Sequence, residues 1–129
     1  MRLLCLAAVC AAQTTLACPA PEDAVVLTSS DNAAPTAYAT IDTLPLSAPF
    51  EVQIAFCGTG TESISEIAFD AVMPAHQHGM NYVVEITNSE GNHFEVSNVV
   101  FHMPGLWQMN VSAELAGQTY EYEAEVTLK

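Results

Sequence analysis

The sequence predicts an all-β protein, an immunoglobulin-like antiparallel β-sandwich of about seven strands. Apolar and polar residues alternate with a period of two through several segments, and turn-forming residues recur at strand-length intervals. No segment shows the 3.6-residue period of an amphipathic helix. With 129 residues, the chain has room for one such domain.

Each expected strand is a short alternating run that ends at turn residues. A short edge strand is expected at 24–27, and the main strands at 50–56, 67–73, 82–86, 94–101, 107–115 and 120–128. The turns between them contain Gly58-Thr59-Gly60, the stretch 88–92, Pro104-Gly105 and Gly117. Trp107, the one tryptophan, is expected to lie at the centre of the core.

The start of the chain has the anatomy of a secretory signal peptide. Arg2 precedes a short apolar run, and cleavage is expected just after Ala17. We divide the chain into a signal peptide at 1–17, a Pro- and Ala-rich leader with an edge strand at 18–44, and the sandwich at 45–129. We therefore expect an exported protein, located in the periplasm, with no transmembrane segment in the mature chain.

Cysteine usage leaves two interpretations open. Cys5 and Cys10 leave with the signal peptide, whereas Cys18 and Cys57 remain. Thr15-Leu16-Ala17-Cys18 is an imperfect lipobox, with the leucine one place nearer the cysteine than usual; if it is processed, Cys18 is acylated and the protein is an outer-envelope lipoprotein. Otherwise Cys18 and Cys57 form a disulfide that closes a loop of about 40 residues and stabilises the fold by about 3–4 kcal/mol. We favour the disulfide.

The chain is strongly acidic, with fifteen Asp and Glu against two basic residues and a net charge of −13. This balance disfavours nucleic acid and anionic membrane surfaces as partners. It raises the local concentration of cations without selecting any one of them.

Two short clusters concentrate histidine and methionine. The stretch 73–80 (Met-Pro-Ala-His-Gln-His-Gly-Met) holds two of the four histidines and two of the five methionines, and Phe101-His102-Met103-Pro104-Gly105 adds one of each. Imidazole and thioether ligands without carboxylate or thiolate favour copper, and Cu(I) over Cu(II). Because a thioether does not titrate whereas histidine ligation weakens below a pH of about 6.5, such a site should retain Cu(I) better than Cu(II) in mild acid.

Strand parity ranks the candidate ligands. In an extended backbone, side chains two residues apart lie on one side, so His76, His78 and Met80 form the expected trio. His102 is the expected fourth ligand, and Met73 and Met103 are second-rank ligands. Outside these clusters, Met109 is expected to fill the core and His93 to be solvated.

The two motifs together resemble the YtkA-like domain family. The resemblance rests on Asp70–Met80 followed by Val99–Trp107, and it covers about residues 45–129. The family consists of small exported β-sandwich domains, related in style to FixH-like proteins and often found near copper and cytochrome oxidase genes. The resemblance implies an immunoglobulin-like fold and suggests copper handling. Leu106 stands where members commonly carry Arg, so a charge-dependent role at that edge is not carried over.

These observations predict an exported copper-binding protein that acts as a chaperone, a store or an accessory to copper efflux or oxidase assembly. Its partners would be the copper ion and a copper transporter or oxidase assembly protein. The alternative is a non-metal immunoglobulin-like interaction module of the bacterial envelope. We expect no enzyme, because the sequence shows no Ser/His/Asp arrangement, no clear carboxylate pair and no phosphate-binding loop.

Overall fold

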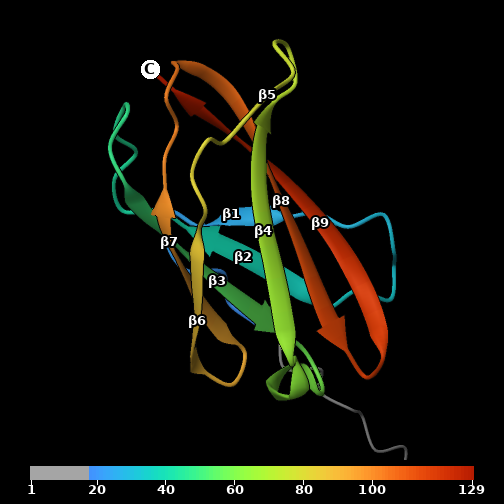
Figure 1. Cartoon of the computed structure of the whole chain (residues 1–129). Coiled ribbons are helices and arrows are strands. Elements are labelled where there is room, and N and C mark those ends of the chain that lie inside the picture. The colour runs from blue at the N-terminus through green and yellow to red at the C-terminus, as the bar shows by residue number, and fades with distance from the viewer. Residues whose placement is uncertain (1–17) are drawn as a thin grey trace, which may run out of the picture.

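The computed structural model describes residues 18–129 and shows two antiparallel sheets packed face to face (Figure 1). The sheets have the strand orders β1-β2-β3-β7-β6 and β5-β4-β8-β9. The strands are β1 Val25–Leu27, β2 Thr36–Thr40, β3 Phe50–Cys57, β4 Glu66–Met73, β5 His78–Gly79, β6 Glu85–Glu90, β7 His93–Val99, β8 Gly105–Leu115 and β9 Gln118–Leu128. A 3₁₀ turn, η1 (Thr61–Ser63), precedes β4. The predicted all-β, immunoglobulin-like sandwich is confirmed.

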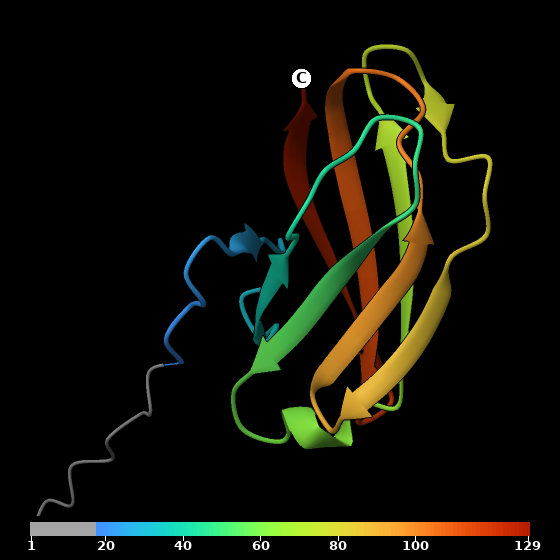
Figure 2. The ribbon, with the colours of Figure 1, turned by 90° about the vertical axis from the view of Figure 1, so that its left-hand side faces the viewer.

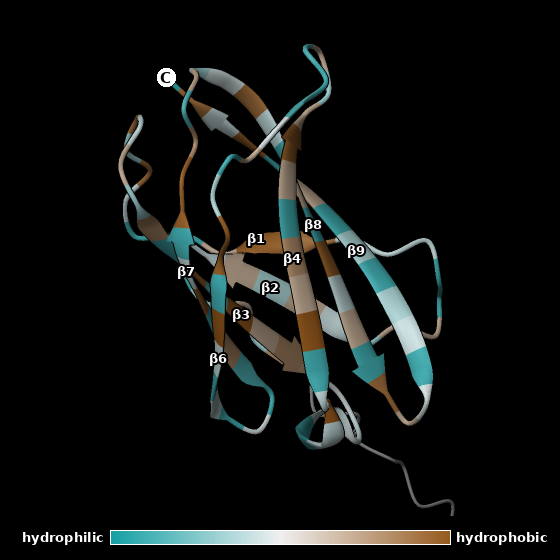
Figure 3. Cartoon of the chain, viewed as in Figure 1, coloured by the Kyte–Doolittle hydropathy of each residue, from teal (hydrophilic) through white to brown (hydrophobic). Residues whose placement is uncertain are grey.

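The period-two pattern places one face of each main strand in the core. Along β3 and β4, buried and more exposed residues alternate. The hydropathy colouring shows the hydrophilic Glu66 and Asp70 of β4 as breaks in an otherwise hydrophobic strand (Figure 3). The longest hairpin, β8–β9, pairs over its whole length and turns at Ala116-Gly117, where both residues have positive φ. Two successive positive φ angles match the twist of the flanking strands, so this tight turn fixes the register of the hairpin.

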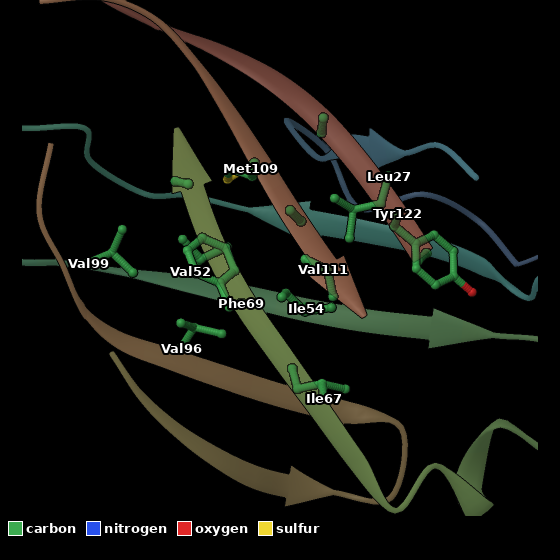
Figure 4. Close-up of a cluster of buried hydrophobic side chains, with 14 of the residues drawn as sticks. Leu27, Val52, Ile54, Ile67, Phe69, Val96, Val99, Met109, Val111 and Tyr122 are labelled. Atoms are coloured by element: carbon green, nitrogen blue, oxygen red, sulfur yellow. The ribbon is translucent and has the colours of Figure 1, made fainter. Parts of the chain in front are cut away.

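The core fills the space between the two sheets. Side chains of β3 and β7 meet those of β4 and β8 in this layer (Figure 4), among them Val52, Val96, Phe69 and Val111. Trp107 is fully buried, as predicted. Its ring stacks on Phe101 with centroids 4.4 Å apart.

The predicted strand at 82–86 is misplaced. β6 begins only at Glu85 and continues to Glu90, so residues 88–90, expected in a turn, belong to the strand. Tyr82 and Val83 instead lie in an exposed loop, where the Asn98 side chain donates a hydrogen bond to the Val83 carbonyl over 2.8 Å. In a paired strand, a backbone N–H would have donated this hydrogen bond. Here the Asn98 side chain donates it instead.

The predicted strand at 94–101 is too long. β7 ends at Val99, just after Asn98 adopts a positive φ of 60°. The alternation fails there, because Val99, Val100 and Phe101 are buried in succession. Parity arguments for the residues that follow, including His102, therefore do not apply.

The sandwich also includes part of the segment 18–44, which was assigned to a leader. β1 contains the expected edge strand, but β2 was not predicted. The inward-facing residues of β2 are Ala37 and Ala39, whose small side chains give little hydrophobic contrast. Beyond β1, Thr28 exchanges backbone hydrogen bonds of 2.8 and 2.9 Å with Glu123 of β9 and so links the two sheets at one edge.

The beginning of the described chain is tied to the end of β3. Cys18 and Cys57 form a disulfide with Cα atoms 6.0 Å apart. A sulfur in this bond is not available for acylation, so the structure agrees with the disulfide interpretation of Cys18. The predicted signal peptide, with Cys5 and Cys10, lies outside the described residues. Among residues 18–129, no helix is long and apolar enough to cross a membrane.

Candidate metal site

His76 and His78 lie on a short hairpin at the end of β4. β5 folds back on β4, with His78 opposite Met73. The intervening residues turn: the His76 backbone N–H donates to the Met73 carbonyl over 3.2 Å, and Gln77 has a positive φ of 52°. The extended backbone assumed for 76–78 is therefore wrong. The turn nevertheless places the two imidazoles near each other, with ring centroids 6.2 Å apart.

His102 is held by the segment between β7 and β8. The Ser47 N–H donates to the Phe101 carbonyl over 2.9 Å, and the Ser47 hydroxyl donates to the His102 carbonyl over 3.4 Å. The Trp107 indole N–H donates to the Met103 carbonyl over 3.0 Å. The Trp107 ring also meets the His102 ring edge to face, with centroids 5.5 Å apart. Hydrogen bonds on both sides thus fix the backbone around His102.

The fold brings the two sequence clusters to one end of the sandwich. The β4–β5 hairpin, the segment 100–104 and the loop 41–49 meet there (Figure 2). The centroids of His78 and His102 are 6.2 Å apart, with the ring planes nearly perpendicular. We call this region, with His76, His78 and His102 at its centre, the histidine end.

The imidazole of His78 is near chelating distance of those of His76 and His102 without having reached it. Metal–nitrogen bonds of about 2.0–2.1 Å place the centroids of two imidazoles on one ion about 5–6 Å apart. In residues 18–129, no three His, Cys, Asp or Glu side chains are placed to hold an ion together. His76 lies in the turn before β5, His78 lies in this two-residue strand, and both side chains are exposed, so a change of side-chain rotamer can bring their rings closer to His102.

His102 has an unsatisfied polar atom. Its Nδ1 is buried and has no hydrogen-bond partner. A buried polar group without a partner costs about 1–3 kcal/mol, and such groups in native proteins call for an explanation. A bound metal ion would supply this explanation, because coordination by the ring would either satisfy Nδ1 or fix the orientation of the imidazole.

The methionines divide between the site and the core. Met80 and Met103 are partly buried at the edge of the core, beside the histidines in sequence. Met73 is only 2% exposed, and its methyl group would lie 3.0 Å from a Cβ at Gly105. Met73 therefore packs beneath the segment that carries His102. Met109 is fully buried, as predicted.

The segments that carry the histidines are uncharged in an otherwise acidic chain. Residues 71–84 and 96–113 contain no Asp, Glu, Lys or Arg. Exposed apolar side chains occur in these segments and in the loop 41–49 (Leu46, Tyr82, Val83 and Leu106), together with the exposed polar side chains of Gln77 and Asn81. The sequence gives no sign that Ser47 and the loop 41–49 contact residue 102, because only the tertiary fold brings this loop there.

A surface groove lies elsewhere on the sandwich. It has a volume of about 460 Å³ and runs between β1 and β9, lined by Thr28, Ser29, Ser30, Asn110, Glu121, Tyr122 and Glu123. It is open and polar and contains no histidine or methionine. Donor chemistry favours the histidine end over this groove as the functional site, because a bound ion needs suitable ligands more than a deep cavity.

Comparison with known proteins identifies no relative. No family model matches the chain, and no curated protein or solved structure matches it. The resemblance to the YtkA-like domain family therefore remains a prediction from the two motifs.

Proposed function

We propose that this protein binds copper at the histidine end, with His76, His78 and His102 as imidazole ligands. Met80 and Met103 are the thioethers near enough in sequence to complete the site. The observation that carries the proposal is the buried, unpaired Nδ1 of His102, next to two exposed imidazoles from a different hairpin. Met73 is left out of this set because it is buried in the core.

The donor chemistry favours copper among the metals. The three imidazoles and the thioethers are neutral, and no carboxylate occurs in the segments that carry them. Calcium and magnesium require oxygen ligands, and zinc rarely takes a thioether. A neutral, partly soft donor set is most suitable for Cu(I), with the imidazoles also able to bind Cu(II). On this proposal the protein is an exported copper chaperone, store or accessory factor.

A competition titration tests copper binding. The mature protein, a His76→Ala/His78→Ala variant and a His93→Ala variant are titrated with Cu(I) against a chromogenic chelator. His93 is the matched control, because it is exposed and lies at the opposite end of the sandwich. We expect stoichiometric, tight binding by the wild type and by His93→Ala, and loss of that binding in the double variant.

Trp107 provides an internal reporter when the same three proteins are titrated with Cu(II). It is the one tryptophan, and its ring lies 5.5 Å from His102, so bound Cu(II) should quench its fluorescence. Equal and weak binding by all three proteins, with unchanged fluorescence, would contradict copper binding. That result would favour the alternative, an interaction module without metal.

A further inference from the structure

The histidine ligands differ in how firmly the fold holds them. His76 and His78 are exposed, and their rings make no hydrogen bond within residues 18–129. His102 is partly buried, its Nδ1 is inaccessible to water, and hydrogen bonds from Ser47 and Trp107 fix its segment. A ligand set with one fixed, partly buried member and two exposed members can lose the exposed ones without unfolding.

Resting on the proposed function, we infer that the histidine end transfers Cu(I) by associative ligand exchange. His102 retains the ion while His76 and His78 are displaced by an acceptor that approaches from solvent. The acceptor is a group with a soft donor atom, a thiolate, thioether or imidazole, presented by another molecule. The protein thereby acts as a carrier of copper and not as a store.

The exchange is balanced in atoms and electrons. A lone pair of the acceptor forms a bond to Cu(I) as the bond from a His76 or His78 nitrogen breaks, and that imidazole leaves as a neutral ring. Copper remains Cu(I), so no oxidant or reductant is needed. A thiol acceptor releases its proton to solvent. The bond to His102 breaks last, after the acceptor has supplied further donors.

The surface around the ligands suits the approach of an acceptor. The segments 71–84 and 96–113 carry no charged side chain, and the loop 41–49 that meets them carries one carboxylate, Asp42. Val83 is 84% exposed and Tyr82 55% exposed, which offers apolar contact area beside the histidines.

The kinetics of copper loss test this inference. Protein loaded with one equivalent of Cu(I) is mixed with increasing concentrations of an anionic chromogenic chelator, and formation of the coloured complex is followed by stopped flow. Associative exchange predicts a rate constant that rises in proportion to chelator concentration. A rate constant independent of chelator concentration would overturn the inference, because copper would then leave before the acceptor arrives.

Single-ligand variants test the unequal roles. We expect His102→Ala to weaken Cu(I) affinity by roughly 100-fold or more, since even outer-shell partners of metal ligands are worth about 10–100-fold. His76→Ala and His78→Ala should each weaken affinity by less than about tenfold, because the other exposed imidazole remains. Equal losses in all three variants would contradict a fixed ligand with two exchangeable ones.

A charge variant tests the approach through the uncharged surface. Val83→Glu/Leu106→Glu replaces two exposed apolar side chains by carboxylates and should slow transfer to the anionic chelator by roughly tenfold at low salt. Val26→Glu, at an exposed position on β1, is the matched control and should transfer at the wild-type rate. Equal rates in the two variants would contradict the assigned route. If the wild type binds no Cu(I), the proposed function fails, and this inference fails with it.

Discussion

The two ends of the sandwich are built on opposite principles. At the end opposite the histidine end, which we call the disulfide end, lie Cys57, η1 and the β6–β7 turn. Asn92 connects these elements: its amide donates to the Phe56 carbonyl over 2.6 Å and to the Thr61 hydroxyl over 3.5 Å. Thr61 is buried, and its hydroxyl in turn donates to the Gly58 carbonyl over 3.0 Å. Polar groups here are satisfied within the protein.

The contrast is sharpest between two histidines. His93, at the disulfide end, is exposed to water, yet its Nδ1 lies 2.9 Å from the Asn92 side-chain oxygen. His102, at the histidine end, is partly buried, yet its Nδ1 has no partner. A buried polar atom needs a hydrogen-bond partner more than an exposed one does. His102 is the more buried of the two histidines, and its Nδ1 is the one without a partner.

If the histidine end binds copper as proposed, the fold maintains its stability at one end and keeps an unpaired ligand atom at the other. Local interactions that reduce stability persist where function requires them, and the rest of the structure must compensate. The disulfide end supplies that compensation through a covalent link and a connected hydrogen-bond network. The expected separation is that substitutions at the disulfide end lower stability and leave copper affinity unchanged, whereas removal of the histidine ligands lowers copper affinity.

Removal of the disulfide should have the largest effect on stability. In a Cys18→Ser/Cys57→Ser variant, the free energy of unfolding should fall by about 3–4 kcal/mol, because the unfolded chain regains the entropy of a closed loop of 39 residues. Copper affinity should be unchanged, since the bond lies at the far end of the sandwich. Denaturant unfolding and Cu(I) competition measure the two quantities. A parallel loss of affinity would break the proposed separation.

High pH should weaken the packing next to the disulfide end. Tyr122 is buried and packs on Phe56 with ring centroids 5.7 Å apart, while its hydroxyl donates to the Pro35 carbonyl over 2.9 Å. Burial, with smaller contributions from Tyr120 and Asp31, raises the pKa of Tyr122 to about 12. In the unfolded chain this phenol ionises from a pH of about 10, so its contribution to stability is complete below pH 10 and is lost as the pH rises to 12.

The loss should amount to at most about 3 kcal/mol and should be absent from a Tyr122→Phe variant. Unfolding by denaturant at several pH values between 9 and 12 measures it, with the variant compared with the wild type at each pH. Equal slopes of stability against pH in the two proteins would contradict the assignment to Tyr122.

Much of the fold follows from local pattern, and the exceptions have physical causes. The alternation in 50–56, 67–73, 107–115 and 120–128 predicted four strands that the structure contains, because one buried face imposes a period of two. β2 was not predicted because alanines form its buried face, and their small side chains give little hydrophobic contrast. β7 ends early because Asn98 takes a left-handed conformation, which a sequence pattern does not reveal.

The candidate site was predictable in composition and only partly in geometry. Residue types and clustering pointed to His76, His78 and His102, and the fold places these three at one end. Parity gave the wrong backbone for 76–78, since Gln77 turns the chain. The unpaired Nδ1 of His102 depends on how Trp107 and the neighbouring segments cover the ring, and these are tertiary contacts that have no signal in the sequence.

The smallest predicted effect is also the most decisive, because the substitution should raise stability, whereas most substitutions lower it. A His102→Phe substitution removes the unpaired nitrogen and keeps a ring against Trp107, so without copper the free energy of unfolding should rise by about 1 kcal/mol. The matched substitution at the disulfide end, Asn92→Ala, removes a donor from the Phe56 carbonyl and should lower it by about 1–3 kcal/mol. Thermal and denaturant unfolding of the copper-free proteins measure both changes, and Cu(I) titration should show binding lost only in His102→Phe. If His102→Phe is less stable than the wild type, the nitrogen is satisfied in solution, and the histidine end is an ordinary part of the fold rather than a site that trades stability for binding.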